Sequence, residues 1–233
     1  MDQIKADLVV KWYIELEGRL LETLKITLYT PETENIFLPP LSNVLLDACS
    51  LLDAIFREEF VGSINRRDLS INNYCTYFES QLSLSTHRTI IYQYPLLYIQ
   101  PFKGWLSPSG SYQQLEWWMA YNKIKHDRIL EYKRATLKNT VQCLCALHQV
   151  VSLSRTFLDA LIRHDFVSFG NWGKEYAKEA IYQTNNDQVT LIVETDLFAT
   201  PVGAKRFPEN TQNISPYHFS FGKKLWRFVG REH

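Results

Sequence analysis

Residues 111–133 read SYQQLEWWMAYNKIKHDRILEYK, and this stretch predicts the helix around which the chain is organised. Ser111 and Gln114 have the spacing of a capping box, in which a hydroxyl and an amide satisfy each other's backbone N–H groups. At about 100° per residue, the side chains separate onto two faces. The predicted polar face holds Glu116, Ala120, Lys123, Asp127 and Glu131, and the apolar face holds Leu115, Trp118, Met119 and Ile129, flanked by Trp117, Tyr121, Ile124 and Tyr132.

Two polar residues fall in the middle of this apolar face. Asn122 and His126 are four residues apart, so they meet on one surface of the helix, and Lys125 and Arg128 lie on its two flanks. A buried amide or imidazole without a partner costs about 1–3 kcal/mol. The two side chains therefore either bond to a neighbouring helix as core residues, or line a cleft or a symmetric interface. The density of polar and basic residues between 122 and 128 keeps a functional groove as the hypothesis to test.

Composition limits the kind of ligand that such a groove would take. The 233 residues suffice for one large domain, or for one domain with an extension. Basic and acidic residues number 25 each, so the overall field does not attract nucleic acid. Between Lys123 and Lys138, however, six basic residues face two acidic ones. Such a local patch suits a small or structured anionic ligand better than nonspecific coating of DNA. A solvated helix face is the alternative, and it explains Lys123 but not Lys125 or Arg128.

Cysteine usage and hydropathy indicate a cytoplasmic protein without a membrane partner. The four cysteines are Cys49, Cys75, Cys143 and Cys145, and we expect all of them to be small buried side chains in a reducing compartment. Charged residues interrupt positions 1–25, so no secretory signal is predicted there. The longest apolar stretch, Thr89–Ile99, is too short to span a bilayer. No metal-ligand spacing or phosphate loop occurs, so we expect neither metal nor cofactor.

The remaining segments predict a helical bundle followed by a different kind of structure. One helix is predicted over residues 2–25, a second one begins after a cap at Ser42, and a third is predicted over about 67–87. The core side of the first helix is predicted to hold Ile4, Leu8, Trp12, Leu16, Leu20 and Leu24. A tract from 134 to about 165 is apolar on most sides, which is typical of the centre of a bundle. His148 in this tract is interpreted as a core histidine.

The last part of the chain predicts strands. Residues 180–184 and 189–198 have strand character around Asn185-Asn186-Asp187, which is a hairpin signal. The predicted fold class is therefore mainly α: a helical bundle over residues 1–170 with a small β-rich extension over 171–233.

A helical domain with long antiparallel helices and the motif Asn122-x-x-x-His126 resembles the HEPN superfamily over about residues 40–165. The resemblance implies a helical bundle that dimerises, and many members are metal-independent ribonucleases of toxin and phage-defence systems. Their motif is an Arg, often followed by a polar residue, with a His four to six residues after the Arg. Asn122 and His126 match this motif, whereas Tyr121 stands where the Arg belongs.

The resemblance implies an RNA-directed protein and assigns roles to the residues of the central helix. His126 would act as acid or base, Arg128 or Lys125 would supply a cation, and Asn122 would orient the phosphate or the imidazole. Trp117, Trp118, Tyr121 and Lys123 are the candidate substrate contacts, with the aromatic rings stacking on a splayed base. The expected partners are RNA or a nucleotide, a second copy of the chain, and an antitoxin or other defence-system protein.

Two alternatives to a metal-independent endoribonuclease stay open, one from the residues of the central helix and one from the C-terminal extension. Tyr121 removes the guanidinium on which the chemistry of the family depends, so the groove would then belong to a non-catalytic HEPN-like module that binds a nucleotide, RNA or a partner protein. Alternatively, the C-terminal extension is the functional part, and the bundle only dimerises.

Overall fold

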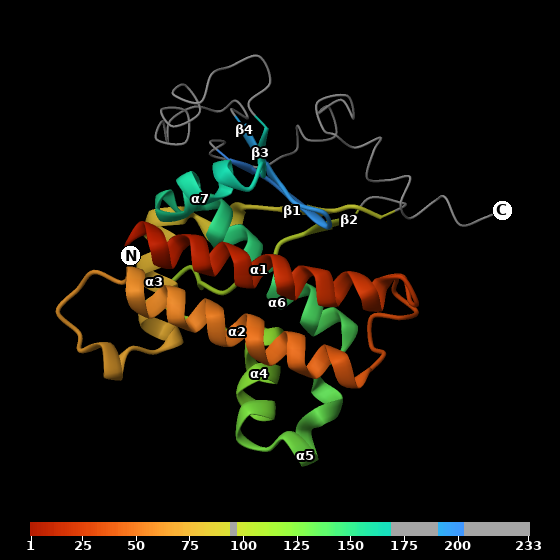
Figure 1. Cartoon of the computed structure of the whole chain (residues 1–233). Helices are drawn as coiled ribbons and strands as arrows, with labels where there is room; N and C mark the ends of the chain where they lie inside the picture. The colour runs from red at the N-terminus through yellow and green to blue at the C-terminus, as the bar shows by residue number, and fades with distance from the viewer. Residues whose placement is uncertain (94–96, 169–190, 203–233) are drawn as a thin grey trace.

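The structure is a computed structural model, and it describes residues 1–93, 97–168 and 191–202. Within these ranges it is mainly helical with a small antiparallel sheet, which confirms the coarse fold class (Figure 1). The helices are α1 (Gln3–Leu24), α2 (Pro39–Glu59), α3 (Ile71–Leu82), α4 (Glu116–His126), α5 (Arg128–Glu131), α6 (Leu137–Leu153) and α7 (Leu158–Arg163). The strands are β1 (Thr89–Ile91), β2 (Leu97–Ile99), β3 (Val167–Ser168), β4 (Leu191–Glu194) and β5 (Phe198–Val202).

Helix α6 forms the centre of the bundle, as its apolar character predicts. Every residue of α6 except Lys138 and Gln142 is buried. It packs against α1, α2 and α4 on its sides and against strand β5. In Figure 1, α1 and α2 run side by side, with α6 behind them and the sheet above them. A helix that is buried on nearly all sides can place residues of several other elements relative to one another.

The buried side of α1 differs from the prediction. Its core residues are Ala6, Val9, Val10, Tyr13, Leu16, Leu20 and Leu24, whereas Ile4, Leu8 and Trp12 are exposed. The prediction that these three belong to the core is wrong. A row of residues four apart turns by about 40° at each step, so a row that begins at Ile4 reaches the buried side only at Leu16.

Two other helix boundaries also differ. Helix α2 begins at Pro39, and Ser42 lies buried inside it rather than at its cap. Proline is favoured in the first turn, where its missing N–H would have no partner in any case. Helix α3 is shorter than predicted and is flanked by the single 3₁₀ turns Arg66–Asp68 and Leu84–Thr86.

The sheet has the order β2-β1-β5-β4-β3, with antiparallel neighbours throughout. Strand β1 pairs with β5 through Ile90↔Ala199 and Ile91↔Phe198. Strands β4 and β5 form a hairpin around Thr195–Leu197, inside the segment predicted as one strand. The predicted strand 180–184 and its turn lie outside the described residues. The sheet joins strands from both sides of the predicted boundary at residue 171, so β5 is part of the core rather than of an appendage.

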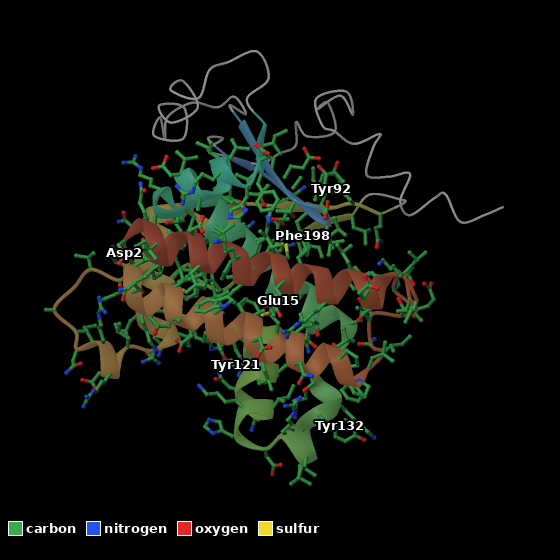
Figure 2. The ribbon with its side chains drawn as sticks, in the orientation of Figure 1. Asp2, Glu15, Tyr92, Tyr121, Tyr132 and Phe198 are labelled. Atoms are coloured by element: carbon green, nitrogen blue, oxygen red, sulfur yellow. The ribbon has the colours of Figure 1, made fainter. Side chains whose placement is uncertain are left out.

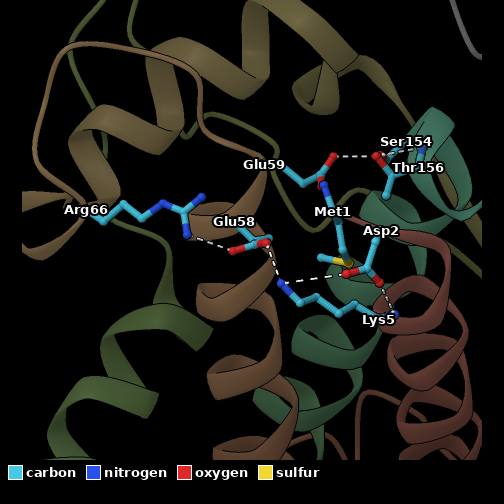
Figure 3. Close-up of polar contacts among 8 residues, drawn as sticks. All are labelled: Met1, Asp2, Lys5, Glu58, Glu59, Arg66, Ser154 and Thr156. Atoms are coloured by element: carbon cyan, nitrogen blue, oxygen red, sulfur yellow. Dashed lines mark hydrogen bonds and ion pairs between the residues drawn. The ribbon is translucent and has the colours of Figure 1, made fainter.

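The start of α1 is tied to the end of α2 by charges (Figure 3). The amino group of Met1 lies 3.2 Å from a carboxylate oxygen of Glu59. Glu58 accepts from Lys5 at 3.1 Å and from Arg66 at 2.9 Å. The Lys5–Glu58 pair is exposed enough to contribute little by itself, whereas the Met1–Glu59 pair is largely shielded from solvent. Both pairs join α1 to α2.

All four cysteines are buried free thiols, as predicted. None of the helices in the described ranges is long and apolar enough to cross a membrane.

Candidate functional site: the basic surface of α4 and α5

The predicted central helix is divided into two helices. Ser111 lies in a loop, where its N–H donates to Ser107 Oγ at 3.0 Å, so the predicted capping box is wrong. Helix α4 begins at Glu116 and ends at His126. Asp127 has non-helical backbone angles, φ −145° and ψ 84°, and its carboxylate accepts from the N–H of Leu130 to cap α5. Aspartate competes for backbone N–H groups in this way, which is why it starts a new helix here.

The division rotates the buried face of α4 relative to the prediction. The buried residues are Trp117, Trp118, Ala120, Tyr121 and Ile124. Asn122 is half-buried, and His126 is exposed. The predicted arc included Ile129 and Tyr132, which belong to separate segments with a different orientation. Asn122 therefore lies at the edge of the apolar face and His126 lies outside it. Neither residue lies in the middle of this face, which is the predicted position.

The aromatic residues of α4 serve the core. Trp117 and Trp118 are buried, and Trp117 Nε1 donates to the carbonyl oxygen of Pro101 at 2.9 Å. The ring centroids of Trp118 and Tyr121 lie 5.4 Å apart. The prediction that these three rings stack on a substrate base is wrong, because their faces are covered by protein. Tyr121 is buried as well, and its hydroxyl edge accepts from Nζ of the exposed Lys125 at 3.1 Å.

Beside this edge lies a surface with an excess of positive charge, which we call the basic surface: Lys123, Lys125, His126, Arg128 and Lys133. All five side chains are exposed. In the described part of the chain, none of its lysines or Arg128 forms an ion pair. Lys125 lies 5.2 Å from the Tyr121 ring centroid, and Arg128 donates to Asn43 Oδ1. Figure 2 labels Tyr121 and Tyr132 at the end of the bundle that α4 and α5 form.

The neighbouring cations differ from those of the basic surface. Arg134 pairs with Glu131, and Lys138 pairs with Glu116 at 3.2 Å. These two charges are neutralised locally, so they add little to the attraction of an anion. The charge available to a ligand is therefore that of Lys123, Lys125, Arg128 and Lys133.

His126 is the last residue of α4 and has no hydrogen-bond partner among the described residues. Its exposure excludes the interpretation of a core histidine bonded to a neighbouring helix. The carbonyl end of a helix favours positive charge, so Lys123, Lys125 and a protonated His126 are all favourably placed in the last turn of α4. The structure also has a groove whose lining comes from α1 and α2, and neither His126 nor Asn122 lines it.

A buried polar cluster was not foreseen from the sequence. Glu17 in α1 accepts a hydrogen bond from the Tyr13 hydroxyl and a second one, at 2.6 Å, from the N–H of Leu197. The Tyr13 oxygen lies 2.9 Å from His148 Nδ1 and 3.1 Å from Thr195 Oγ1. Burial raises the pKa of Glu17 to about 7, and the hydrogen bonds from Tyr13, Thr195 and Leu197 partly oppose this. The cluster fastens the β4–β5 turn between α1 and α6.

The signal for this cluster was present in the sequence. Tyr13 and Glu17 are four residues apart, and Glu17 precedes Leu20 on the side of α1 that holds Val10 and Tyr13. A carboxylate on the apolar side of a helix predicts a buried partner. The interpretation of His148 as a core histidine is confirmed.

In the ranges that the structure covers, no three or more His, Cys, Asp or Glu side chains gather where they could hold a metal ion. Comparison of the chain with known protein families, with curated proteins and with solved structures finds no match.

Proposed function

We propose that this protein is a HEPN-like module that binds RNA through the basic surface of α4 and α5. The observation that carries the proposal is the set of four exposed cations, Lys123, Lys125, Arg128 and Lys133, without carboxylate partners in the described chain. Lysine and arginine side chains that are free of local ion pairs bind phosphate oxygens and release counterions. Because the whole chain is neutral, the attraction is confined to this surface.

One aromatic ring at this surface fits RNA. Tyr132 is exposed and is held by an edge contact with Phe37, with ring centroids 4.9 Å apart. Lys133 Nζ lies 5.9 Å from the Tyr132 ring centroid. A ring fixed next to a cation can stack on an unpaired base while the ammonium binds the adjacent phosphate. Tyr132 therefore replaces the buried Trp117 and Trp118 as the proposed stacking residue.

Binding is tested by fluorescence anisotropy with a labelled single-stranded RNA over a range of salt concentrations. Replacing Lys123 and Lys133 by alanine is expected to weaken binding. Since each phosphate contact contributes about 0.7 to the salt slope for single strands, the double variant should lose about 1.4. Lys11→Ala is the matched control, because Lys11 is also exposed but pairs with Asp7 on α1. Equal affinity and equal slope for the double variant and the wild-type protein would refute RNA binding at this surface.

A second candidate function is metal-independent RNA cleavage, and it is favoured by the exposed imidazole of His126, which forms no hydrogen bond with the residues that the structure describes. His126 would take the proton of a 2′-hydroxyl, and a cation would stabilise the charge that develops on the phosphate. Lys125 is the proposed cation, because the Tyr121 hydroxyl holds its ammonium and Tyr121 occupies the position of the missing Arg. Asn122 and Arg128 would orient the phosphate. A second acid must protonate the leaving oxygen, and we propose the His126 of a second copy for this role.

Cleavage is tested by incubating RNA with the protein in EDTA and analysing the ends of the products. Fragments with 2′,3′-cyclic phosphate ends are expected from the wild-type protein and not from His126→Ala, which should keep its circular dichroism spectrum and its affinity for RNA. His164→Ala is the control and should cleave as the wild type does. His164 follows α7, beside Asp7 on α1, and is not part of the basic surface. Binding without cleavage by the wild-type protein would leave the non-catalytic module. A role in a toxin or phage-defence system stays a prediction of the resemblance.

A further inference from the structure

The α5 tip, defined as Ile129 and Leu130, is the most exposed pair of adjacent large apolar side chains near the basic surface. Ile129 is 84% exposed, and Leu130 is 77% exposed. In Figure 1, α5 projects from the bundle at the end opposite to the sheet. Lys125, Arg128 and Lys133 flank the tip without ion pairs to described residues. Asp127 and Glu131 also lie beside the tip, where Asp127 caps α5 and Glu131 pairs with Arg134, so the net charge around the tip is positive. Two adjacent exposed aliphatic side chains on such a projection are typical of a contact surface rather than of a solvated loop.

A groove of complementary character lies between α1 and α2. It has a volume of about 430 Å³ and is lined by Trp12, Glu15, Leu16, Arg19, Asp47, Ser50, Leu51 and Ala54. Trp12 is 47% exposed and forms one wall, and the small side chains Ser50 and Ala54 leave space opposite. Leu8 and Ile4 continue the exposed apolar row along α1 beyond Trp12. These exposed residues are the ones that the helical pattern wrongly assigned to the core.

The polar end of the groove is acidic. Arg19 donates to Asp47 at 3.0 Å and to Glu15 at 2.5 Å, so one guanidinium stands between two carboxylates. Both carboxylates remain more than half exposed. The groove therefore combines an apolar floor with a net negative end. The α5 tip combines two aliphatic side chains with a net positive border.

We propose that the α5 tip of one copy of this chain docks in the α1–α2 groove of a second copy. Ile129 and Leu130 then lie against Trp12 and Leu51, and Lys133 and Arg128 come close to the carboxylates at the groove's polar end. The contact joins two different surfaces, so it is heterologous. It goes beyond RNA binding and does not depend on it.

Charge and geometry favour this occupant over two others. Without an RNA phosphate between them, two α5 tips packed against each other would bring Lys125, Arg128 and Lys133 of both copies together, and like charges oppose such a contact. Docking within one copy is prevented by Arg128, which holds the start of α5 to Asn43 on α2 while the tip points away from the bundle. A second copy is the partner whose tip can approach the groove freely.

The test is the molar mass in solution, measured by light scattering and by sedimentation over a range of protein concentrations. Wild-type protein is expected to gain mass as its concentration rises, and to gain less at high salt. A tip variant, Ile129→Ser with Leu130→Ser, should stay monomeric. A groove variant, Ala54→Trp, should also stay monomeric, because Ala54 is exposed and the larger ring fills the groove without changing the core.

Mixing the two variants separates this contact from a symmetric one. The tip variant keeps an intact groove and the groove variant keeps an intact tip, so an equimolar mixture should recover a dimer. Val61→Ser is the control, because Val61 is an exposed aliphatic residue outside both surfaces, and it should associate as the wild-type protein does. A wild-type protein that stays monomeric, a variant that associates like the wild type, or a mixture that stays monomeric would each overturn the proposal, provided that circular dichroism shows folded chains.

Discussion

The substitution Glu17→Gln tests the physical account of the buried cluster directly. Glu17 is a buried carboxyl whose oxygens accept from the Tyr13 hydroxyl and from the N–H of Leu197. No lysine or arginine is among the groups that shift its pKa, and the nearby carboxylate of Asp196 adds to the effect of burial. The neutral amide of Gln keeps nearly the same shape and can still accept from Leu197. The substitution therefore removes the charge of the ionised form and preserves the packing.

The expected effect follows from the pKa of Glu17, which is about 7 in the folded protein against a usual value of 4.5. The folded chain holds the proton more tightly than the unfolded chain does. Its contribution to stability is fully present below the unfolded pKa and is lost as the pH rises through about 7. At about 1.4 kcal/mol for each pKa unit, the wild-type protein should lose about 3 kcal/mol that Glu17→Gln retains.

The assay is urea unfolding followed by tryptophan fluorescence at several pH values between 4 and 8. The difference in unfolding free energy between the variant and the wild type isolates Glu17, because the other titrating groups are the same in both proteins. This difference should shift in favour of the variant by about 3 kcal/mol from pH 4 to pH 8. The control is Glu22→Gln, an exposed carboxyl on the same helix that pairs with Lys25. Parallel pH profiles for wild type and Glu17→Gln would show that the buried carboxyl does not titrate in this range, and the reasoning would be refuted.

Three further substitutions test the packing and the backbone, and a fourth serves as a control for the last of them. Tyr13→Phe removes a donor to Glu17, so the same urea titration should show a loss of about 1–3 kcal/mol and a midpoint at higher pH; an unchanged midpoint would contradict the hydrogen bond. Phe56→Ala opens a cavity in the core and should cost about 3–5 kcal/mol by calorimetry, whereas a cost below 1 kcal/mol would contradict its burial. Ser83 has φ 49°, so Ser83→Gly should stabilise by up to about 1 kcal/mol in urea, while Ser80→Gly inside α3 should destabilise.

Helical periodicity located most of the bundle. The range of α1 follows from the apolar pattern of its own residues, because an amphipathic helix needs only local information to be recognised. The tract predicted over 134 to about 165 is divided in the structure, because α6 ends at Leu153 and a 3₁₀ turn and α7 follow it. The same pattern failed to orient the first turns of α1. Ile4 and Trp12 are large apolar residues of the kind found in cores, but the neighbouring helices cover the side of α1 next to theirs. Which apolar side of α1 is covered depends on the positions of α2 and α6. The sequence of α1 alone does not contain this information.

The sheet illustrates a larger gap. Strand β1 finds its partner more than a hundred positions later, in Phe198 and Ala199. All five residues of β5 are buried, so the strand lacks the alternation by which a half-buried strand is recognised. The strand signal over 189–198 was real, but the turn at Thr195–Leu197 carries no glycine or proline to indicate it.

For the candidate site, the sequence determined the inventory: a histidine, an asparagine and several lysines and arginines close together, on a helix of a mainly helical chain. It also determined that this segment carries more positive charge than the rest of the chain. Only the tertiary structure decided that Trp117, Trp118 and Tyr121 turn inward while Lys123, Lys125 and His126 turn outward, and that α4 ends before Asp127. Local propensity fixes which residues are neighbours along a helix, but exposure is set by which side the rest of the chain covers, and that is a property of the whole fold.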